Sequence, residues 1–533
     1  MTMTWQITHI YPFLFAIIPV MRIVAAYPGW AQLDDVAIVL TAVLAACGVV
    51  YGLILLATRR RGDRLPPLVL LGVVIGFWAY TRVATLVEHR TSLSHAVLLS
   101  LWAAVTVGII WWLVRRPVLL DRAERFLTLT SGMLVGWFVL SIGAAEYRSA
   151  RAVRQSTVVR RLAEPILVQP GARVGSKRDI YLIVLDEYAN AEVTGRLFGF
   201  DNQVFLDALR QVGFVVPAVH GNYLHTFLSL PSLLNASHLA DLSGELGRRS
   251  IDRTVPDYLV EHNRTVPFLK SQGYQFVFFP SQSWEATRHN PQADLEVQVW
   301  HGLDPARELT RSGLRIVMTK TSLLKSFSGG APGYTRDHVT RTLAAIAEVP
   351  KIPGPVFTFA HLLVPHDPYV FDRDCGPAHH KIDSGRSQPK GAAYVEQIQC
   401  VDHLMLDLVS TLLRTSELPP VILLQGDHGS KTLLFDQAET AEKITLAAAR
   451  ERLGAFGAYY LPDHGSEVFG DSVTIVNVMG EVLRFYLGAA VPRQPDDMHI
   501  SVDAAPYAFK RVDFAWLARE DWSARPGSKE ADR

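Results

Sequence analysis

Cysteine is scarce in this chain: its 533 residues include only Cys47, Cys375 and Cys400. Cys47 lies in a long apolar run, so the rest of the chain can form at most one disulfide. If Cys375 and Cys400 lie outside the cytoplasm, one disulfide between them is compatible with the sequence, and two unpaired thiols fit equally well. A fold held together by several disulfides is therefore excluded.

An excess of charge of either sign is also absent. Lys and Arg number 52 against 51 Asp and Glu, so nothing in the composition indicates a nucleic-acid partner. Hydrophobic residues make up 49% of the chain, but nearly all long apolar runs fall before residue 146. The partner indicated by this distribution is a membrane.

Five apolar runs have about the ~20 residues that cross a hydrocarbon core as a helix. The runs, and hence the predicted membrane spans, are roughly 10–27, 36–57, 66–87, 94–114 and 126–145. The first could instead be a cleaved signal peptide, but we interpret it as a retained span, because the preceding "MTMTWQITH" contains no Lys or Arg and no cleavage site leads into a soluble stretch. The sequence therefore predicts a multi-pass helical membrane domain over 1–146.

The basic residues predict the orientation of these spans. Arginines crowd "TRRRGDRL" and "RRPVLLDRAER", the second and fourth loops, whereas "PGWAQLDD" has none. Basic loops mark the cytoplasmic side, so everything after residue 146 is expected outside. The arginines of "YRSARAVRQSTVVRR" oppose this orientation, although large translocated domains commonly override such a local charge.

After the membrane region the pattern changes twice. Residues 147–178 combine a basic juxtamembrane helix, around 147–163, with a linker rich in Pro and Gly. From 179 to about 515, short β-rich runs alternate with helical stretches, and 516–533 form a C-terminal tail. Strands alternating with helices predict an α/β domain with a mostly parallel central sheet covered on both faces.

Two of the buried strands end on metal-binding residues. "IYLIVLDEY" ends on Asp186 and Glu187, and "VILLQGDHG" ends on Asp427 and His428. In parallel sheets ligands bind beyond the carboxyl ends of the strands, so these side chains should converge. Either Asp alone could cap the following helix, but carboxylates together with one imidazole suit one divalent ion, Zn or Mn.

The triplet "DHG" occurs a second time, at 463–465 in "LPDHGSEV". Here Tyr459 and Tyr460 lead into Pro462, and a proline this close favours an edge strand or loop over a central strand. We interpret this copy as a surface turn.

A third stretch, "GNYLHTFLSLPSLLNASHL" at 221–239, supplies hydroxyls. Thr226, Ser229 and Ser232 fall near the start of an apolar helical run, where a helix N-terminus suits an anion. They could simply cap the helix. A cation beside one of them would lower the pKa of that hydroxyl and make it a competent nucleophile.

These motifs carry a family resemblance. "IVLDEY", "NYLHTFLSLPSLLN", "FTFAHLLVPHDPYVF" and "LLQGDHG", in this order after five apolar runs, resemble the sulfatase-like branch of the alkaline phosphatase superfamily. Within that branch the chain is similar to membrane-anchored lipoteichoic acid synthases and lipid A phosphoethanolamine transferases. The resemblance implies that Thr226 is the nucleophile, that Asp186, Asp427 and His428 hold the metal together with Thr226, and that His366 contacts the phosphate or leaving group.

Two further residues near these motifs have less defined expected roles. His361 is expected to pack at a strand end. Glu187 is expected either as a ligand or as a partner of a ligand, and the sequence does not choose between them.

The function implied by the resemblance is metal-dependent transfer of a phospho-substituent through a phosphothreonine intermediate. The donor would be a membrane lipid, the acceptor an envelope glycan or lipid, and the location the bacterial inner membrane with the catalytic domain periplasmic or extracellular. The alternatives are a phosphodiesterase, phosphatase or sulfatase of the same fold, and a non-catalytic envelope scaffold.

Two departures from the family patterns bear on the substrate. Phosphoethanolamine transferases carry a further active-site histidine shortly after "DHG", and "SKTLLFDQAETAEKITLAAARERL" has none, which argues against phosphoethanolamine as the transferred group. Sulfatases have an Arg two residues after the Pro of "SLPSL", where this chain has Leu233, and an apolar side chain cannot supply the hydrogen bonds of a guanidinium.

Overall fold

The computed structural model describes most of the chain. The described residues are 9–26, 33–58, 65–88, 95–115, 117–171, 175–281, 283–299, 313–324, 331–378, 390–431 and 438–518. The arginines expected in the second loop, at 59–61 and 64, and most of the expected tail, from 519 onward, lie outside these residues. The described residues form two compact units.

The first unit contains a helix at each of the five apolar runs. They are α1 (Tyr11–Ala26), α2 (Leu33–Thr58), α3 (Leu65–Glu88), α4 (His95–Val114) and α5 (Pro117–Gln155). Three apolar segments, Leu33–Thr58, Leu65–Ala84 and Ala123–Gln155, are long enough to cross a membrane, whereas Tyr11–Ala26 and Val97–Trp112 are shorter. The helical membrane region is thus present, while a count of five spans stays a prediction.

A segment from much later in the sequence folds with these helices. Residues 303–331 belong to the first unit, although they fall within the range 179–515 of the α/β pattern. Their helix α14 (Gly313–Thr321) buries Leu314 and Met318 in an apolar cluster with residues of α1 and α2. Arg315 on α14 forms a buried ion pair with Asp35 at 3.0 Å. Because an unpaired buried charge costs roughly 3–5 kcal/mol, this pair ties α14 to one position in the unit.

The second unit comprises 152–302 and 332–533, and its core is a seven-stranded sheet. Its strands are, in spatial order, β2 (Phe214–Val215), β9 (Gly457–Tyr460), β7 (Val421–Gly426), β1 (Ile180–Leu185), β6 (Val356–Leu362), β4 (Gln275–Phe279) and β5 (Leu295–Glu296). From β7 to β5 neighbouring strands run parallel, whereas β9 runs antiparallel to both of its neighbours. The sheet is therefore mixed.

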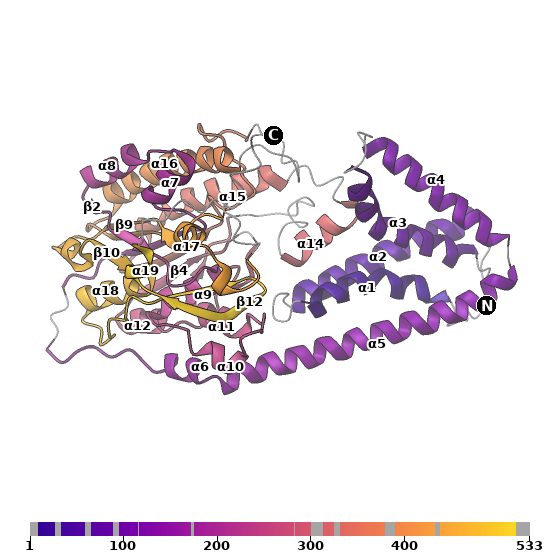
Figure 1. Ribbon diagram of the computed structural model, residues 1–533, viewed down its shortest axis with the longest axis horizontal. Coiled ribbons are helices and arrows are strands. Elements are labelled where there is room, and N and C mark those ends of the chain that lie inside the picture. The colour runs from indigo at the N-terminus through magenta and orange to yellow at the C-terminus, as the bar shows by residue number, and fades with distance from the viewer. Residues whose placement is uncertain are drawn as a thin grey trace. The chain divides into compact units, whose positions relative to one another are not determined.

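Strand β1 shows why the sheet is covered on both faces. All six of its residues are buried, and alternate residues of a strand point to opposite faces. Tyr181, Ile183 and Leu185 join one apolar cluster, and Ile180, Leu182 and Val184 join another. Figure 1 shows α7, α8 and α16 together on one side of the strands and α9, α11 and α12 on the other.

The first cluster packs against α7 (Ala191–Phe198), α8 (Gln203–Gln211), α15 (Ala331–Ile346) and α16 (Lys390–Thr415). The second packs against α9 (Thr226–Asn235), α11 (Thr254–Glu261), α12 (Thr265–Ser271) and α18 (Ile475–Leu487). Shorter helices are α6 (Thr157–Leu162), α10 (Leu242–Leu246), α17 (Leu446–Leu453) and α19 (Phe514–Leu517).

Two small sheets complete the unit. One has the order β10 (Ser472–Thr474), β3 (Ala218–His220) and β8 (Gly454–Ala455), and the other pairs β11 (Met498–Val502) with β12 (Ala505–Val512). The run "FVVPAV" is divided between β2 of the large sheet and β3 of a small one, because Pro217 between them lacks the N–H that a continuous ladder needs.

The two cysteines of this unit are joined. Cys375 and Cys400, the latter on α16, form a disulfide with their Cα atoms 4.9 Å apart. The alternative of two unpaired thiols is thereby set aside. Such a link restricts the unfolded chain and typically stabilises a fold by ~2–4 kcal/mol.

Candidate active site

The predicted site lies where β1 and β7 end side by side. The two strands are parallel neighbours, with Leu185 opposite Gly426. Asp186 and Asp427 each follow the last residue of their strand and are therefore delivered to the same edge of the sheet. His428 comes next on the loop after β7.

Ligand atoms of Asp186, Asp427 and His428 all lie within 4.8 Å of one another, and all three residues are buried. His428 Nε2 is 3.1 Å from Asp427 Oδ2 and 3.9 Å from Asp186 Oδ1. The other oxygen of Asp427 accepts hydrogen bonds from the backbone N–H groups of Glu187, at 3.1 Å, and His428, at 3.0 Å. Asp427 thereby fixes both loops and presents one oxygen to the centre.

The two carboxylates and the imidazole nitrogen at this centre are all acceptors. The ring Nδ1 of His428 lies 3.1 Å from the Gly429 carbonyl, which can only accept, so Nδ1 carries the hydrogen and Nε2 presents its lone pair to the centre. Among the described residues, Asp186 Oδ1 and Asp427 Oδ2 are buried without a hydrogen-bond partner. Buried acceptors facing one another are costly, and a shared cation would relieve them.

The same burial shifts the pKa values of the three candidate ligands. Removal from water raises the pKa of Asp186 to about 6 and, together with the charge of Asp186, raises that of Asp427 well above its usual range. Burial and the nearby Arg452 guanidinium hold the pKa of His428 well below its usual value, so its imidazole is neutral. Two buried carboxylates are costly when both are ionised, and a divalent cation would offset that cost. A neutral imidazole beside them can serve as a further ligand, so the group suits Zn or Mn.

Thr226 is the hydroxyl that reaches this centre. It is the first residue of α9, and its Oγ1 lies 2.9 Å from His428 Nε2. A helix N-terminus carries partial positive charge and unpaired N–H groups, which favour an anion beside Thr226.

The other two candidate hydroxyls point elsewhere. Ser229 is fully buried and donates to the Tyr223 carbonyl at 3.2 Å, and Ser232 donates to the Ser229 carbonyl at 2.8 Å. Leu233 is fully buried in the apolar cluster below the sheet. These residues therefore support the helix and do not face the centre.

His366 and Glu187 form a second polar group at the edge of the centre. His366 Nε2 lies 3.9 Å from Glu187 Oε2, and its side chain is 39% exposed. Burial alone would lower the pKa of His366, but the carboxylates of Glu187 and Asp186 outweigh it and raise the pKa to about 9. Together with Asp367, these two residues could also hold an ion.

His361, expected to pack at a strand end, is buried near the end of β6 and also lies beside Asp186. Its Nδ1 lies 3.0 Å from Thr287 Oγ1, and its Nε2 lies 3.9 Å from Asp186 Oδ2. Burial, with a smaller effect of His366, lowers its pKa to about 3. The neutral ring therefore borders the carboxylate of Asp186.

Arg452 is a site residue for which the sequence offered no motif. Its guanidinium is buried, lies 3.0 Å from His428 Nε2 and pairs with Glu187 Oε1. It lies in "ARERL" near the end of α17, a run that reads as an ordinary charged helix. α17 leads directly into β8, whose Ala455 pairs with Ala189 on the loop after β1, and this connection brings Arg452 to the site.

The second "DHG" lies away from this centre. It follows β9, which runs antiparallel to β7, so it is delivered to the opposite edge of the sheet. Asp463 pairs there with Arg178, two residues before β1 begins, at 2.6 Å. Asp463 and His464 both have positive φ, as a tight turn requires. The expectation of a surface turn is confirmed.

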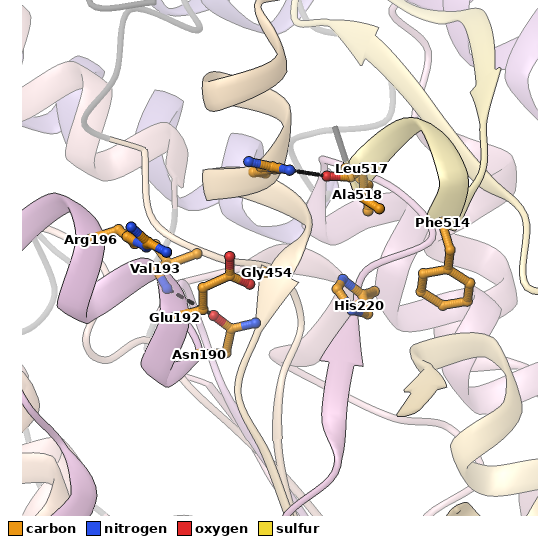
Figure 2. Close-up of a pocket in the computed structure, with 10 residues that line it drawn as sticks. Asn190, Glu192, Val193, Arg196, His220, Gly454, Phe514, Leu517 and Ala518 are labelled. Atoms are coloured by element: carbon orange, nitrogen blue, oxygen red, sulfur yellow. Dashed lines mark hydrogen bonds between the residues drawn. The ribbon is translucent and has the colours of Figure 1, made fainter. Parts of the chain in front are cut away.

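A pocket of about 900 Å³ lies among α7, α17 and α19 (Figure 2). It is lined by Asn190, Glu192, Val193, Arg196, His220, Arg450, Gly454, Phe514, Leu517 and Ala518. Asn190 follows Glu187 on the loop after β1, and Gly454 begins β8 directly after α17, the helix of Arg452. Within the described chain, the three candidate ligands do not line it.

The comparisons with known proteins give structural likenesses only. No family model and no curated protein matches the chain. The C-terminal periplasmic domain of EcEptC from Escherichia coli is 14% identical over 67% of this chain and 98% of its own, with a TM-score of 0.42. The lipooligosaccharide phosphoethanolamine transferase A from Neisseria meningitidis is 11% identical over 89% of this chain and 96% of its own, with a TM-score of 0.36.

A third solved structure is a protein in the alkaline phosphatase superfamily from Vibrio parahaemolyticus. It is 12% identical over 62% of this chain and 74% of its own, with a TM-score of 0.38. At such identities and TM-scores we base no functional conclusion on these likenesses. The proposal that follows is based on the geometry of the site.

Proposed function

We propose that this chain is a membrane-anchored enzyme of the sulfatase-like branch of the alkaline phosphatase superfamily. In this proposal it transfers a phospho-substituent from a lipid or envelope donor to an envelope lipid or glycan, through a phosphothreonine at Thr226. Asp186, Asp427, His428 and Thr226 would hold one divalent ion, Zn or Mn.

The observation that carries this proposal is the position of Thr226 Oγ1. It lies 2.9 Å from His428 Nε2, on the buried centre where Asp186 and Asp427 each present an oxygen without a hydrogen-bond partner among the described residues. A hydroxyl among metal-ligating atoms at a helix N-terminus is the arrangement that nucleophilic attack on a phosphate needs. When bound, the cation would lower the hydroxyl pKa and offset charge on the phosphate.

The chain's own residues account for the other parts of the reaction. In the first step the Thr226 Oγ1–phosphorus bond forms while the bond to the leaving oxygen breaks, and the hydroxyl proton passes to water. His366, at the exposed edge of the site, donates the proton that the leaving oxygen takes up. In the second step an acceptor alcohol attacks phosphorus and gives its proton to His366, which the first step left neutral, while the bond from phosphorus to Thr226 Oγ1 breaks and Thr226 takes up a proton from water.

The membrane region would hold the active site beside a bilayer. Apolar helices precede the α/β unit, and three segments in them are long enough to span. A lipid donor in the outer leaflet would reach an enzyme anchored in that way without leaving the membrane. We therefore place the α/β unit outside the cytoplasm.

This orientation can be measured with reporter fusions. A phosphatase reporter that folds only outside the cytoplasm should be active when fused after residue 170 and inactive when fused at residue 62, because the basic second loop is expected inside. The reverse pattern of activities would contradict the proposed location.

The transferred group can be sought in a deletion strain. Loss of the enzyme should remove one phospho-substituent from an envelope lipid or glycan, and mass spectrometry of extracted lipids and glycans would detect the missing mass. Restoring the wild-type chain should return it, whereas a Thr226→Ala chain should not. An envelope identical in the two strains would reject transfer and favour a hydrolase.

A further inference from the structure

One face of α14 is buried in the first unit, where the helix contacts α1, α2 and α3 (Figure 1). Leu314 and Met318 are buried in the apolar cluster that α14 shares with α1 and α2. Ser322, the residue directly after the helix, is also fully buried, so buried positions recur at every fourth residue. Lys320 between them is exposed. This spacing is typical of an amphipathic helix that packs against a partner along one stripe.

Two buried polar contacts fix α14 in this position. Arg315 pairs with Asp35 of α2 at 3.0 Å, and the exposed fractions of the two side chains are only 7% and 5%. The Thr81 hydroxyl of α3 donates to the Ser322 carbonyl at 2.6 Å, and this contact is buried as well. Because a guanidinium keeps its charge, Arg315 can lie buried only while that charge is compensated. These contacts therefore favour one position of α14 over others.

The contacts of α14 lie at one end of the membrane helices. Ile23 and Val24 of the apolar cluster are near the end of α1. Asp35 and Val39 are near the start of α2, and Thr81 is near the end of α3. Helices that follow one another through a bilayer alternate in direction, so these three ends share one side. The basic second loop follows the end of α2 and is therefore expected on the opposite side.

The segment that contains α14 begins and ends in the α/β unit. Residues 152–302 and those from 332 onward belong to the second unit, whereas 303–331 belong to the first. The sequence between 282 and 355 has no apolar run of the ~20 residues that cross a bilayer, so the segment does not cross and return. In a membrane, α14 must therefore lie on the same side as the α/β unit. The basic loops predict the same arrangement.

We propose that residues 313–322, here called the docking segment, tether the α/β unit to the outer end of the membrane helices, and that Asp35 and Arg315 thereby position the active site for a donor in the outer leaflet. This inference rests on the proposed function, in which the donor is a membrane lipid. Without docking, the chain through α5 is the one tether between the units, whereas a docked α14 adds a connection before it and another after it. Added tethers raise the effective concentration of a membrane-bound donor at the active site, but they do not change that of a dissolved substrate.

Docking is measured by cysteine labelling of the full chain purified in detergent. Ser322→Cys should resist a water-soluble maleimide because Ser322 is fully buried, whereas Lys320→Cys should react. Adding Asp35→Leu should make the thiol at position 322 react at least about ten-fold faster, because the unpaired Arg315 guanidinium then favours release of the helix into water. The unsubstituted chain gives the background, since Cys47 is buried and the other two cysteines form a disulfide.

Two matched variants distinguish the buried pair from a general loss of charge. Asp34→Leu removes the neighbouring carboxylate, which is exposed, and should leave position 322 protected. The double variant Asp35→Leu with Arg315→Met has no unpaired charge at this pair and should restore protection, because apolar replacement of both partners of a buried ion pair is often tolerated. A double variant that reacts as fast as Asp35→Leu would show that the ion pair does not control docking.

The positioning role is measured on two substrates. When the deletion strain is complemented with Asp35→Leu, the phospho-substituent should appear in the envelope at least about ten-fold more slowly after induction than with wild type. Turnover of dissolved bis(p-nitrophenyl) phosphate by the purified chain should be unchanged, because the candidate ligands lie in the second unit. Asp34→Leu and the double variant should match wild type on both substrates.

The outcomes separate this inference from the proposed function. Labelling of Ser322→Cys in an otherwise wild-type chain, or protection that persists after Asp35→Leu, would overturn docking. Equal loss of both activities in Asp35→Leu, or no loss in the envelope, would overturn the positioning role. A wild-type chain that neither hydrolyses the dissolved phosphodiester nor changes the envelope would overturn the proposed function, and labelling would still decide docking. Should Asp35→Leu fail to fold, Asp35→Asn also removes the charge while keeping the size of the side chain, and the same results are expected of it.

Discussion

Replacing Thr226 by alanine is expected to lower turnover of a phosphodiester substrate by at least about a thousand-fold, because the attacking oxygen is removed. The fold should be unaffected, since α9 is held by the buried apolar residues that follow Thr226. Thr226→Ser keeps a hydroxyl at the same position and should retain measurable turnover. Intact-protein mass spectrometry after exposure to donor should find an added phosphate on wild type and none on Thr226→Ala.

Ser229→Ala is the matched control for this substitution. Ser229 lies on the same helix, but its hydroxyl is buried and donates to the Tyr223 carbonyl, so most of the activity should remain. A formylglycine at Ser229, or sulfate ester cleavage that survives Thr226→Ala, would instead establish a sulfatase and exclude the phosphothreonine mechanism.

Substitution of the candidate ligands should remove both the metal and the activity. In Asp427→Asn the side chain can still accept from the N–H groups of Glu187 and His428, but it loses the charge that faces the centre. Loss of a residue that merely orients a ligand costs ~10–100-fold in metal affinity, so loss of a ligand should cost more than about 100-fold. Elemental analysis of Asp427→Asn and His428→Gln should find bound metal reduced from one per chain to near zero.

The second "DHG" supplies the matched controls for this experiment. Asp463→Asn weakens only the pair with Arg178, which keeps its hydrogen bond to the Pro419 carbonyl, and Asp463 itself is exposed, so the cost in stability should be small. His464→Gln changes a residue of the same surface turn. Both should bind one metal per chain and retain activity. Equal loss of metal at the two copies would show that the wrong copy had been assigned to the site.

The two central strands and the residues that end them were readable from the sequence, because both depend on local patterns. "IYLIVLD" and "VILLQGD" are continuous apolar runs, as fully buried strands require, and they form β1 and β7. The rule for the carboxyl ends of parallel strands then predicted that Asp186, Asp427 and His428 would meet, and their ligand atoms lie within 4.8 Å of one another. The position of Thr226 at a helix start also followed from its neighbours in sequence.

Other features depend on which segments are neighbours in space, and only the tertiary structure decided them. The two copies of "DHG" lie at opposite edges of the sheet because β9 runs antiparallel to β7, and strand direction is set by sheet topology rather than by three letters. The helix α14 joins the first unit because Leu314 and Met318 find an apolar cluster there and Arg315 finds Asp35.

The sequence by itself therefore determined which residues carry the candidate chemistry, and the tertiary structure determined the charges around them. Arg452 is 24 residues beyond His428 in a helix of ordinary composition, and its proximity to Glu187 follows from the packing of α17 and β8 beside β1. Because both side chains are buried, loss of either one would leave the other as a charge without compensation away from water, which is energetically costly. Whether Glu187 is a ligand or a partner was open in the sequence, and its contact with Arg452 is the physical reason to propose a partner.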